Sequence, residues 1–273
     1  YHMEKQFYRR HLPHWQIPEA TYFVTYRLYG SVPRSVIEQL KADYRAALES
    51  AEQAALAEVI SEHGLTGAEA HLSLGLKELD FWSGNRTPEV RSGDVTWSTA
   101  PERTSGVRES PERTSGVPPE LRTKLDQIGK KKAYEERKRY FGHFDAFLDR
   151  NLNEPYWLQQ PEIAQINADA LHFYHQKMYK LYAFCIMSNH IHVLFEALPE
   201  APALEVVMRR LKRYTALQCN RALGWEGHFW EAESYDHIVR QDEFDRILAY
   251  ILNNPVKAGL ATNWQAWPWT YCA

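Results

Sequence analysis

The chain has 273 residues, 44% hydrophobic and 25% charged, a composition typical of a globular protein with one large domain or two small ones. The formal net charge of −3 excludes a protein that is basic over its whole surface, so a nucleic-acid site would have to be a local basic face. Three cysteines without a CxxC pair exclude a disulfide framework and a zinc knuckle, and no apolar stretch approaches the roughly 20 residues of a membrane span. We therefore expect a cytoplasmic protein without a membrane partner.

The N-terminal region combines a basic and aromatic arm, FYRRHLPH at residues 7–14, with a β-branched and aromatic run at residues 21–29. The run has the composition of a strand, and Gly30 ends it. Pro33 and the apolar residues after it have helical spacing, so we expect a helix that continues to about residue 60.

Two insertions are predicted in the next part of the chain. Approximately residues 65–117 have no periodic pattern, and the heptapeptide PERTSGV occurs twice there, at residues 101–107 and 111–117. A segment rich in Pro, Gly, Ser and charge cannot bury a core, so we expect a flexible, repeat-bearing insertion. Mixed charge at helical spacing then predicts a helical insertion over approximately residues 118–153. Both would interrupt a single domain that comprises residues 1–273.

The rest of the chain alternates between helical and strand patterns. Residues 161–174 have an apolar stripe at helical spacing, and residues 181–195, LYAFCIMSNHIHVLF, read as two apolar strands joined by a short polar turn. Residues 204–222 form an amphipathic helix and the most basic stretch of the chain, residues 235–240 a short strand, and residues 241–253 a further helix.

Without the insertions, the order is strand, helix, hairpin, helix, strand, helix. This order predicts an α+β fold, a ferredoxin-like antiparallel sheet with helices on one face, to which the insertions add extra helices and a long flexible segment.

The predicted hairpin contains a pair of histidines. On an extended backbone His190 and His192 point the same way, while Ile191 points into the opposite layer. Neutral imidazole is a good ligand, so the pair could hold one divalent metal. The same spacing is also typical of a strand with two half-exposed polar residues, and short motifs of this kind often match by chance.

The last predicted helix presents a phenol and an amide together, because Tyr250 and Asn254 are one helical turn apart. Asn254 could complete a metal site begun by His190 and His192, and a tyrosine beside that metal is a candidate nucleophile toward a phosphodiester. The alternative for Tyr250 is half-buried packing, which is common for tyrosine in helices.

Two separated motifs, MSNHIHVLF at residues 187–195 and AYILNNPVKAGL at residues 249–260, together resemble the HUH-type tyrosine transposases, specifically the REP-associated tyrosine transposases. The resemblance extends to the N-terminal arm, the basic helix, the segment GHFWEAESYDHIVR at residues 227–240 and the Trp-Pro-Trp at residues 267–269. Ser188 stands where a proline is more common in this motif, a change that leaves the histidines intact.

The resemblance implies the ferredoxin-like fold and a division of roles within the site. It implies that His190, His192 and Asn254 bind a divalent metal, Mg²⁺ or Mn²⁺, and that Tyr250 becomes linked to the 5′-phosphate of cleaved single-stranded DNA. It further implies a REP-like DNA hairpin as substrate and an enzyme that acts as a monomer or a homodimer. The arm residues that would help to read the hairpin are Tyr8, Arg9 and Arg10.

Further DNA contacts are predicted on and after the basic helix, whose position after the histidines would place positive charge near the metal. Its cations would neutralise phosphates, and two aromatic side chains could stack on a base. The alternatives are snorkelling surface cations for the helix and core packing for the ring of Trp230. The candidates are Arg209, Arg210, Lys212, Arg213, Tyr214 and Trp230.

The sequence therefore predicts a transposase that cleaves and rejoins single-stranded or hairpin DNA through a covalent 5′-phosphotyrosine and a divalent metal. One alternative is a domesticated DNA-binding protein that has lost cleavage. A second alternative is a metal-dependent phosphodiesterase in which water attacks in place of the tyrosine.

Overall fold

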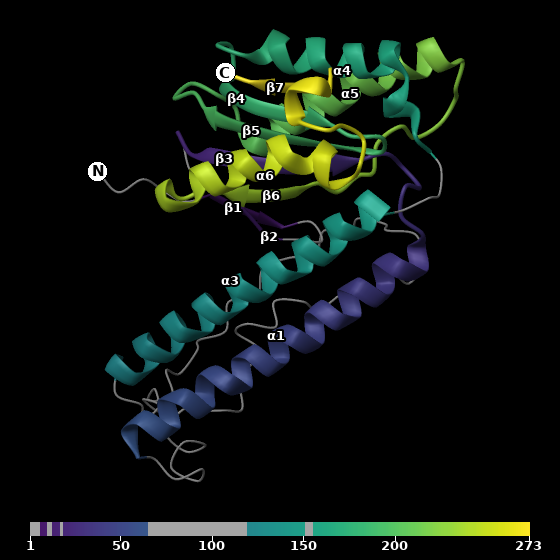
Figure 1. Ribbon diagram of the computed structural model, residues 1–273. Coiled ribbons are helices and arrows are strands. Elements are labelled where there is room, and N and C mark those ends of the chain that lie inside the picture. The colour runs from purple at the N-terminus through teal and green to yellow at the C-terminus, as the bar shows by residue number, and fades with distance from the viewer. Residues whose placement is uncertain (1–5, 10–12, 17–18, 65–118, 151–154) are drawn as a thin grey trace, which may run out of the picture. The chain divides into compact units, whose positions relative to one another are not determined.

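A computed structural model of the chain describes residues 6–9, 13–16, 19–64, 119–150 and 155–273 (Figure 1). The chain divides into two compact units, the first comprising Tyr1–Asp43 with Arg139–Ala273 and the second comprising Tyr44–Lys138. The predicted flexible insertion at approximately 65–117, with both copies of PERTSGV, lies outside the described residues.

The centre of the first unit is an antiparallel sheet of five strands in the order β6-β3-β5-β4-β7. The hairpin between β4 and β5 is the predicted one, and its turn is tight because the Met187 amide donates to the His190 carbonyl at 2.9 Å. Across the β3 and β5 pair, Thr25 lies opposite His192 and Arg27 lies opposite His190. The strands are β3 Thr21–Arg27, β4 Tyr179–Ile186, β5 His190–Ala197, β6 Tyr235–Ile238 and β7 Thr270–Cys272.

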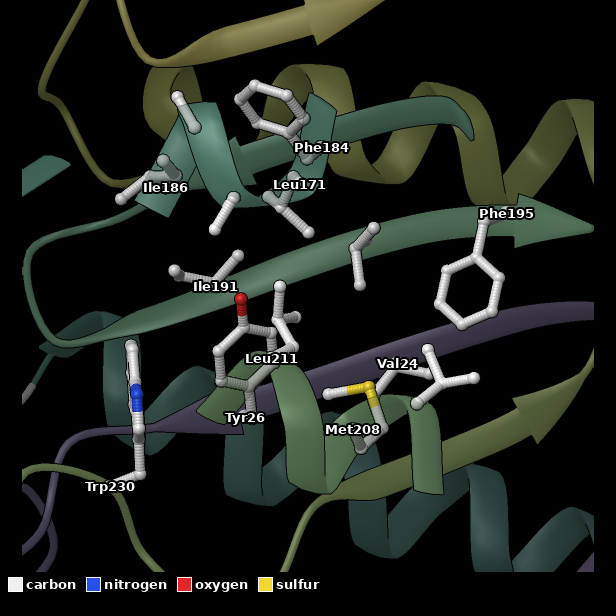
Figure 2. Packing of buried hydrophobic residues seen from close by; sticks show 14 of the residues in the cluster. Val24, Tyr26, Leu171, Phe184, Ile186, Ile191, Phe195, Met208, Leu211 and Trp230 are labelled. Atoms are coloured by element: carbon white, nitrogen blue, oxygen red, sulfur yellow. The ribbon is translucent and has the colours of Figure 1, made fainter. Parts of the chain in front are cut away.

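Two helices cover one face of this sheet, α4 Pro161–Tyr174 and α5 Leu204–Leu223. The apolar residues of α5 recur at helical spacing, and Gly224, in the left-handed conformation at φ 61°, ends the helix. Figure 2 shows side chains of this core, which α4, α5 and the central strands share; among them are Val24, Leu171, Ile191, Met208 and Leu211.

The order β3, α4, β4, β5, α5, β6 is the βαββαβ arrangement of a ferredoxin-like fold, so the predicted α+β class and antiparallel sheet are confirmed. The structure departs from the expected helices on one face in one respect. Helix α6, Phe244–Lys257, packs on the face opposite to α4 and α5 (Figure 1). The physical reason is that both faces of the central strands are apolar: Phe23 and Leu194 lie in a second core cluster with Ile247 and Ile251 of α6.

Helix α3, Pro119–Arg150, falls in the predicted helical insertion, and its residues from Arg139 onward belong to the first unit. In that unit the ring of Phe141 stacks on Tyr235 with a centroid distance of 3.9 Å, on the same face of the sheet as α6. The long helix predicted after Pro33 is α1, Arg34–His63.

The described part of the second unit is an antiparallel pair of helical segments, one from α1 and one from α3. Lys132 Nζ lies 3.0 Å from Glu58 Oε2, and Lys124 forms an ion pair with Glu62. Lys124 precedes Lys132 along α3, whereas its partner Glu62 follows Glu58 along α1. The two segments are therefore antiparallel.

Shorter elements complete the described residues. Strands β1 Gln6–Arg9 and β2 Pro13–Gln16 pair as a hairpin, so the predicted basic arm contains a strand. The C-terminal strand β7 pairs with β4, and the Trp267 Nε1–H donates to the Ile186 carbonyl at 2.9 Å. Three 3-10 turns are η2 Trp157–Gln159, η3 Gln241–Glu243 and η4 Trp264–Ala266. Within the part of the chain that the structure describes, no helix has the length and apolar character needed to cross a bilayer.

Candidate metal and nucleophile site

The two histidines lie at the start of β5, on the face of the sheet that α6 covers. The alternation predicted for them is confirmed: Ile191 belongs to the core beneath α4 and α5, whereas the His192 ring stacks on Phe23 at a centroid distance of 5.7 Å. His190 is 1% exposed and His192 is 0% exposed, which excludes the alternative of two half-exposed strand residues.

Hydrogen bonds orient both imidazole rings. The Nδ1–H of His190 donates to Asn189 Oδ1 at 2.7 Å, and His192 Nδ1 is hydrogen-bonded to Thr25 Oγ1 at 2.7 Å. The two Nε2 atoms then face each other at 3.0 Å. A proton on Nδ1 leaves a lone pair on Nε2, and partners of this kind commonly fix the ring of a metal-binding histidine.

Asp145, on α3, is not among the predicted site residues, yet it lies against both imidazoles. Its Oδ1 atom is 3.3 Å from His192 Nε2 and 3.9 Å from His190 Nε2. One ligand atom from each of these three buried residues lies within 4.8 Å of the others. The other oxygen, Oδ2, accepts a hydrogen bond from the Tyr250 hydroxyl.

Asn254 is fully buried, and neither atom of its amide has a hydrogen-bond partner among the described residues. Asp145 Oδ1 also lacks one. A buried polar atom without a partner costs about 1–3 kcal/mol, so a cluster of such atoms indicates a place for a further group. A side-chain hydrogen bond from Asn254 is nevertheless among the causes that lower the pKa of Asp145, so the amide lies close to the carboxylate although no contact of normal hydrogen-bond geometry joins them.

Burial is the main cause of the pKa shifts at the site. Burial and the nearby Asp149 carboxylate raise the pKa of Asp145 to about 8, although Lys257 opposes this rise. Burial, with a smaller contribution from Lys257, lowers the pKa of His190 to about 3, and burial also lowers the pKa of His192 well below its usual value. Both imidazoles are therefore neutral lone-pair donors at neutral pH.

The residues fit a divalent cation. Two imidazole nitrogens and a carboxylate oxygen are ligands that divalent metals accept, and Asn254 supplies further unpaired polar atoms. The 3.0 Å between the Nε2 atoms of His190 and His192 matches adjacent ligands of an octahedral ion with bonds of about 2.1 Å, which lie about 3 Å apart.

Tyr250 lies on α6, one turn before Asn254, and its side chain reaches the same cluster. Its ring is in edge contact with Phe23 and His192, at centroid distances of 6.0 and 5.7 Å. Its hydroxyl donates to Asp145. The ring is thus packed, as the alternative for Tyr250 proposes, and the phenol oxygen is at the same time directed to the residues that could bind a metal.

The basic helix α5 does not lie beside this cluster. The expectation that it brings positive charge near the metal is wrong, because α5 packs on the Ile191 face of the sheet and the histidines project from the other face. A cation that does lie near the cluster is Lys257 of α6, whose Nζ is 2.9 Å from Asp149 Oδ2.

The predicted DNA contacts on and near α5 differ in their surroundings. Arg209, Arg210, Arg213 and Tyr214 are exposed, and Arg209 lies beside a cavity of about 310 Å³ between α5 and residues 227–236. By contrast, the ammonium of one further candidate is engaged: Lys212 Nζ donates to three backbone carbonyls, those of Glu231, Ala232 and Glu233.

Trp230 is a core residue. It is 7% exposed, its Nε1–H donates to Thr215 Oγ1 at 2.9 Å, and its ring meets Tyr26 edge-on at 4.8 Å. This arrangement fits the packing alternative. Of the arm residues, Tyr8 and Arg9 lie in β1, and Arg10 lies outside the described residues.

Comparison with known proteins gives a match over the segment that contains the histidines. Residues 159–254 match the family model described as IS200-like transposase, so the resemblance predicted from the two motifs is confirmed over this segment. The matched segment runs from η2 to Asn254 and includes His190, His192 and Tyr250. Asp145 lies outside it.

A solved structure of a REP-associated tyrosine transposase bound to a REP hairpin is also similar. It is 20% identical, the likeness covers 44% of this chain and 70% of that chain, and the TM-score is 0.37. Among curated proteins, none matches.

Proposed function

We propose that the protein is a metal-dependent transposase that cleaves and rejoins single-stranded DNA, with Tyr250 as the nucleophile. The observation that carries this proposal is the convergence of a tyrosine hydroxyl and two buried neutral imidazoles within a segment that matches an IS200-like transposase. A divalent cation, Mg²⁺ or Mn²⁺, would polarise a non-bridging oxygen of the scissile phosphate.

The residues of the chain divide the work. His190, His192 and Asn254 would hold the cation, and Thr25 and Asn189 fix the two rings. The phenol oxygen of Tyr250 attacks phosphorus and gives up its proton to solvent, and the bond from phosphorus to the 3′ oxygen breaks as that oxygen takes up a proton. The products are a 5′-phosphotyrosine and a free 3′ hydroxyl. Because the phosphoester bond is exchanged rather than hydrolysed, a second strand can be joined without ATP.

We propose a REP-like hairpin with an adjacent single strand as the substrate, bound by a monomer or a homodimer. The resemblance of the N-terminal arm to that of REP-associated transposases favours a reading role for Tyr8, Arg9 and Arg10. Exposed cations on α5 would add phosphate contacts away from the cluster, and these are Arg209, Arg210 and Arg213. Tyr214, 49% exposed, could stack on a base.

In domain terms, we propose one transposase domain over residues 1–273 with two insertions between β3 and α4. The first, approximately 65–117, carries the repeat, and the second, approximately 118–153, is helical and contains α3. The proposal draws support from the ferredoxin-like order of the elements on both sides of the insertions.

A Tyr250→Phe variant tests the function. We expect this variant to bind a hairpin oligonucleotide with wild-type affinity in a gel-shift assay and to form no covalent adduct in Mn²⁺ on a denaturing gel. Tyr29→Phe is the matched control, because Tyr29 is 52% exposed on the surface, and it should form the adduct normally.

The remaining outcomes separate the alternatives. An adduct that persists in Tyr250→Phe refutes the assignment of the nucleophile. Cleavage without any adduct, retained in Tyr250→Phe and lost in His192→Ala, indicates a phosphodiesterase that uses water. Binding by the wild type without metal-dependent nicking of any hairpin indicates a DNA-binding protein.

A further inference from the structure

Asp145 comes from a part of the chain that neither motif nor family match includes. It lies on α3, before the matched segment 159–254, and is fully buried. The same carboxylate meets both halves of the site: Oδ1 is 3.3 Å from His192 Nε2, and Oδ2 accepts the hydrogen bond from Tyr250.

The surroundings of this carboxylate do not account for its burial. No lysine or arginine among the described residues forms an ion pair with Asp145, and the nearby Lys257 is paired with Asp149 instead. Its Oδ1 atom has no hydrogen-bond partner there. A buried carboxylate oxygen without a partner is costly unless the group is protonated or the oxygen meets a cation or a metal.

The direction of the unpaired oxygen identifies the missing partner. Oδ1 faces the two Nε2 atoms, which are themselves 3.0 Å apart, so three donor atoms from two elements converge on one point. A divalent cation can accept two nitrogen lone pairs and a carboxylate oxygen at the same time.

We infer that Asp145 is a further protein ligand of the cation through Oδ1 and the positioning residue of Tyr250 through Oδ2. This inference rests on the proposed function. It means that the inserted helix α3 completes the site, because one rigid carboxylate fixes the nucleophile relative to the cation. Asn254 and the histidines belong to the matched segment, whereas Asp145 is contributed by the insertion.

Mn²⁺ titration of the full-length chain by calorimetry tests the inference with a readout other than activity. Asp145→Asn keeps the shape and removes the charge, and we expect it to weaken Mn²⁺ binding at least tenfold. Asp145→Glu keeps the charge and should recover part of the affinity. Glu135→Gln is the matched control, since its side chain lies on the same helix and is 52% exposed, and it should bind Mn²⁺ like the wild type.

The positioning role has its own readout. With Mn²⁺ raised to saturation, Asp145→Asn should form the adduct at least tenfold more slowly while its affinity for the hairpin stays within twofold of the wild type. Circular dichroism and the thermal midpoint establish that each variant is folded. If Asp145→Asn unfolds, Asp145→Glu alone decides: its Mn²⁺ affinity should differ from the wild type by more than threefold, and an equal affinity refutes the inference.

Failure of this inference is distinguishable from failure of the proposed function. If His192→Ala loses Mn²⁺ binding and a folded Asp145→Asn keeps it, the ligand role is refuted and the transposase proposal stands. If Asp145→Asn binds Mn²⁺ more tightly or forms the adduct faster, the carboxylate blocks the site instead of completing it. If the wild type does not bind Mn²⁺, both proposals fall.

Discussion

Replacing Asn254 with leucine should stabilise the protein in the absence of metal. Both amide atoms are buried without a hydrogen-bond partner among the described residues, and each such group costs about 1–3 kcal/mol. Leucine has the same branched outline and no polar atom, but it is larger than asparagine, so a cost of overpacking at this buried position subtracts from the gain. We therefore expect the free energy of unfolding of Asn254→Leu to rise by about 1–3 kcal/mol in EDTA, where the wild type cannot use the amide.

Saturating metal should reverse part of this gain. At a Mn²⁺ concentration 100 times the dissociation constant, the wild type gains about 2.7 kcal/mol, whereas a variant with a tenfold weaker site gains about 1.4 kcal/mol. Urea unfolding followed by tryptophan fluorescence measures both values, since Trp230 and Trp267 pack within the first unit. Asn253→Leu is the control, because Asn253 is exposed on the same helix and should change by no more than about 0.5 kcal/mol in either buffer.

A destabilisation of Asn254→Leu by more than about 1 kcal/mol in EDTA would refute this reasoning, because it would mean that the amide makes hydrogen bonds in the metal-free protein. An equal gain from Mn²⁺ in the variant and the wild type would remove Asn254 from the set of ligands.

Two further predictions concern the DNA contacts. Trp230→Phe removes the hydrogen bond to Thr215 and should lower the free energy of unfolding by about 1–2 kcal/mol while leaving hairpin affinity unchanged in a gel-shift assay; a selective loss of affinity would return Trp230 to the DNA interface. Lys212→Met should likewise destabilise by about 1–2 kcal/mol, since Lys212 holds three carbonyls, whereas Arg213→Gln should leave stability unchanged and reduce the salt dependence of binding by about one unit of slope. If Lys212→Met instead reduced the salt dependence and Arg213→Gln lowered the stability, Lys212 would be the phosphate contact.

Local patterns in the sequence predict the elements that carry the matched segment. Residues 161–174 have the helical stripe of α4, and the helix has those bounds. The alternation of His190 and Ile191 follows from strand geometry alone. The joint presentation of Tyr250 and Asn254 follows from the pitch of a helix, and Pro255 does not end α6 as its type would suggest, since the helix continues to Lys257.

What the sequence cannot predict is which surface each helix meets. Helix α5 follows the histidines along the chain but packs on the other side of the sheet, because both connecting helices of this fold share one face. Asp145 has no motif. The sequence gives one indication of its position: Asp145 and Asp149 are spaced so that they lie on the same helix face as the apolar residues Phe141 and Leu148. Carboxylates on an otherwise apolar helix face are unusual. β7 has three residues, too few for an alternating pattern.

The central position of β5 makes the histidine pair sensitive to chain length. β5 is bonded to β3 on one side and to β4 on the other, so its register is fixed along both edges. A deletion of one residue in the turn at Ser188 and Asn189 that shifted β5 by one position would direct Ile191 toward Tyr250 and bury both imidazoles beneath α4 and α5. Insertions and deletions at this turn should therefore be far more damaging than side-chain substitutions in it, since a change of one residue inverts the whole strand.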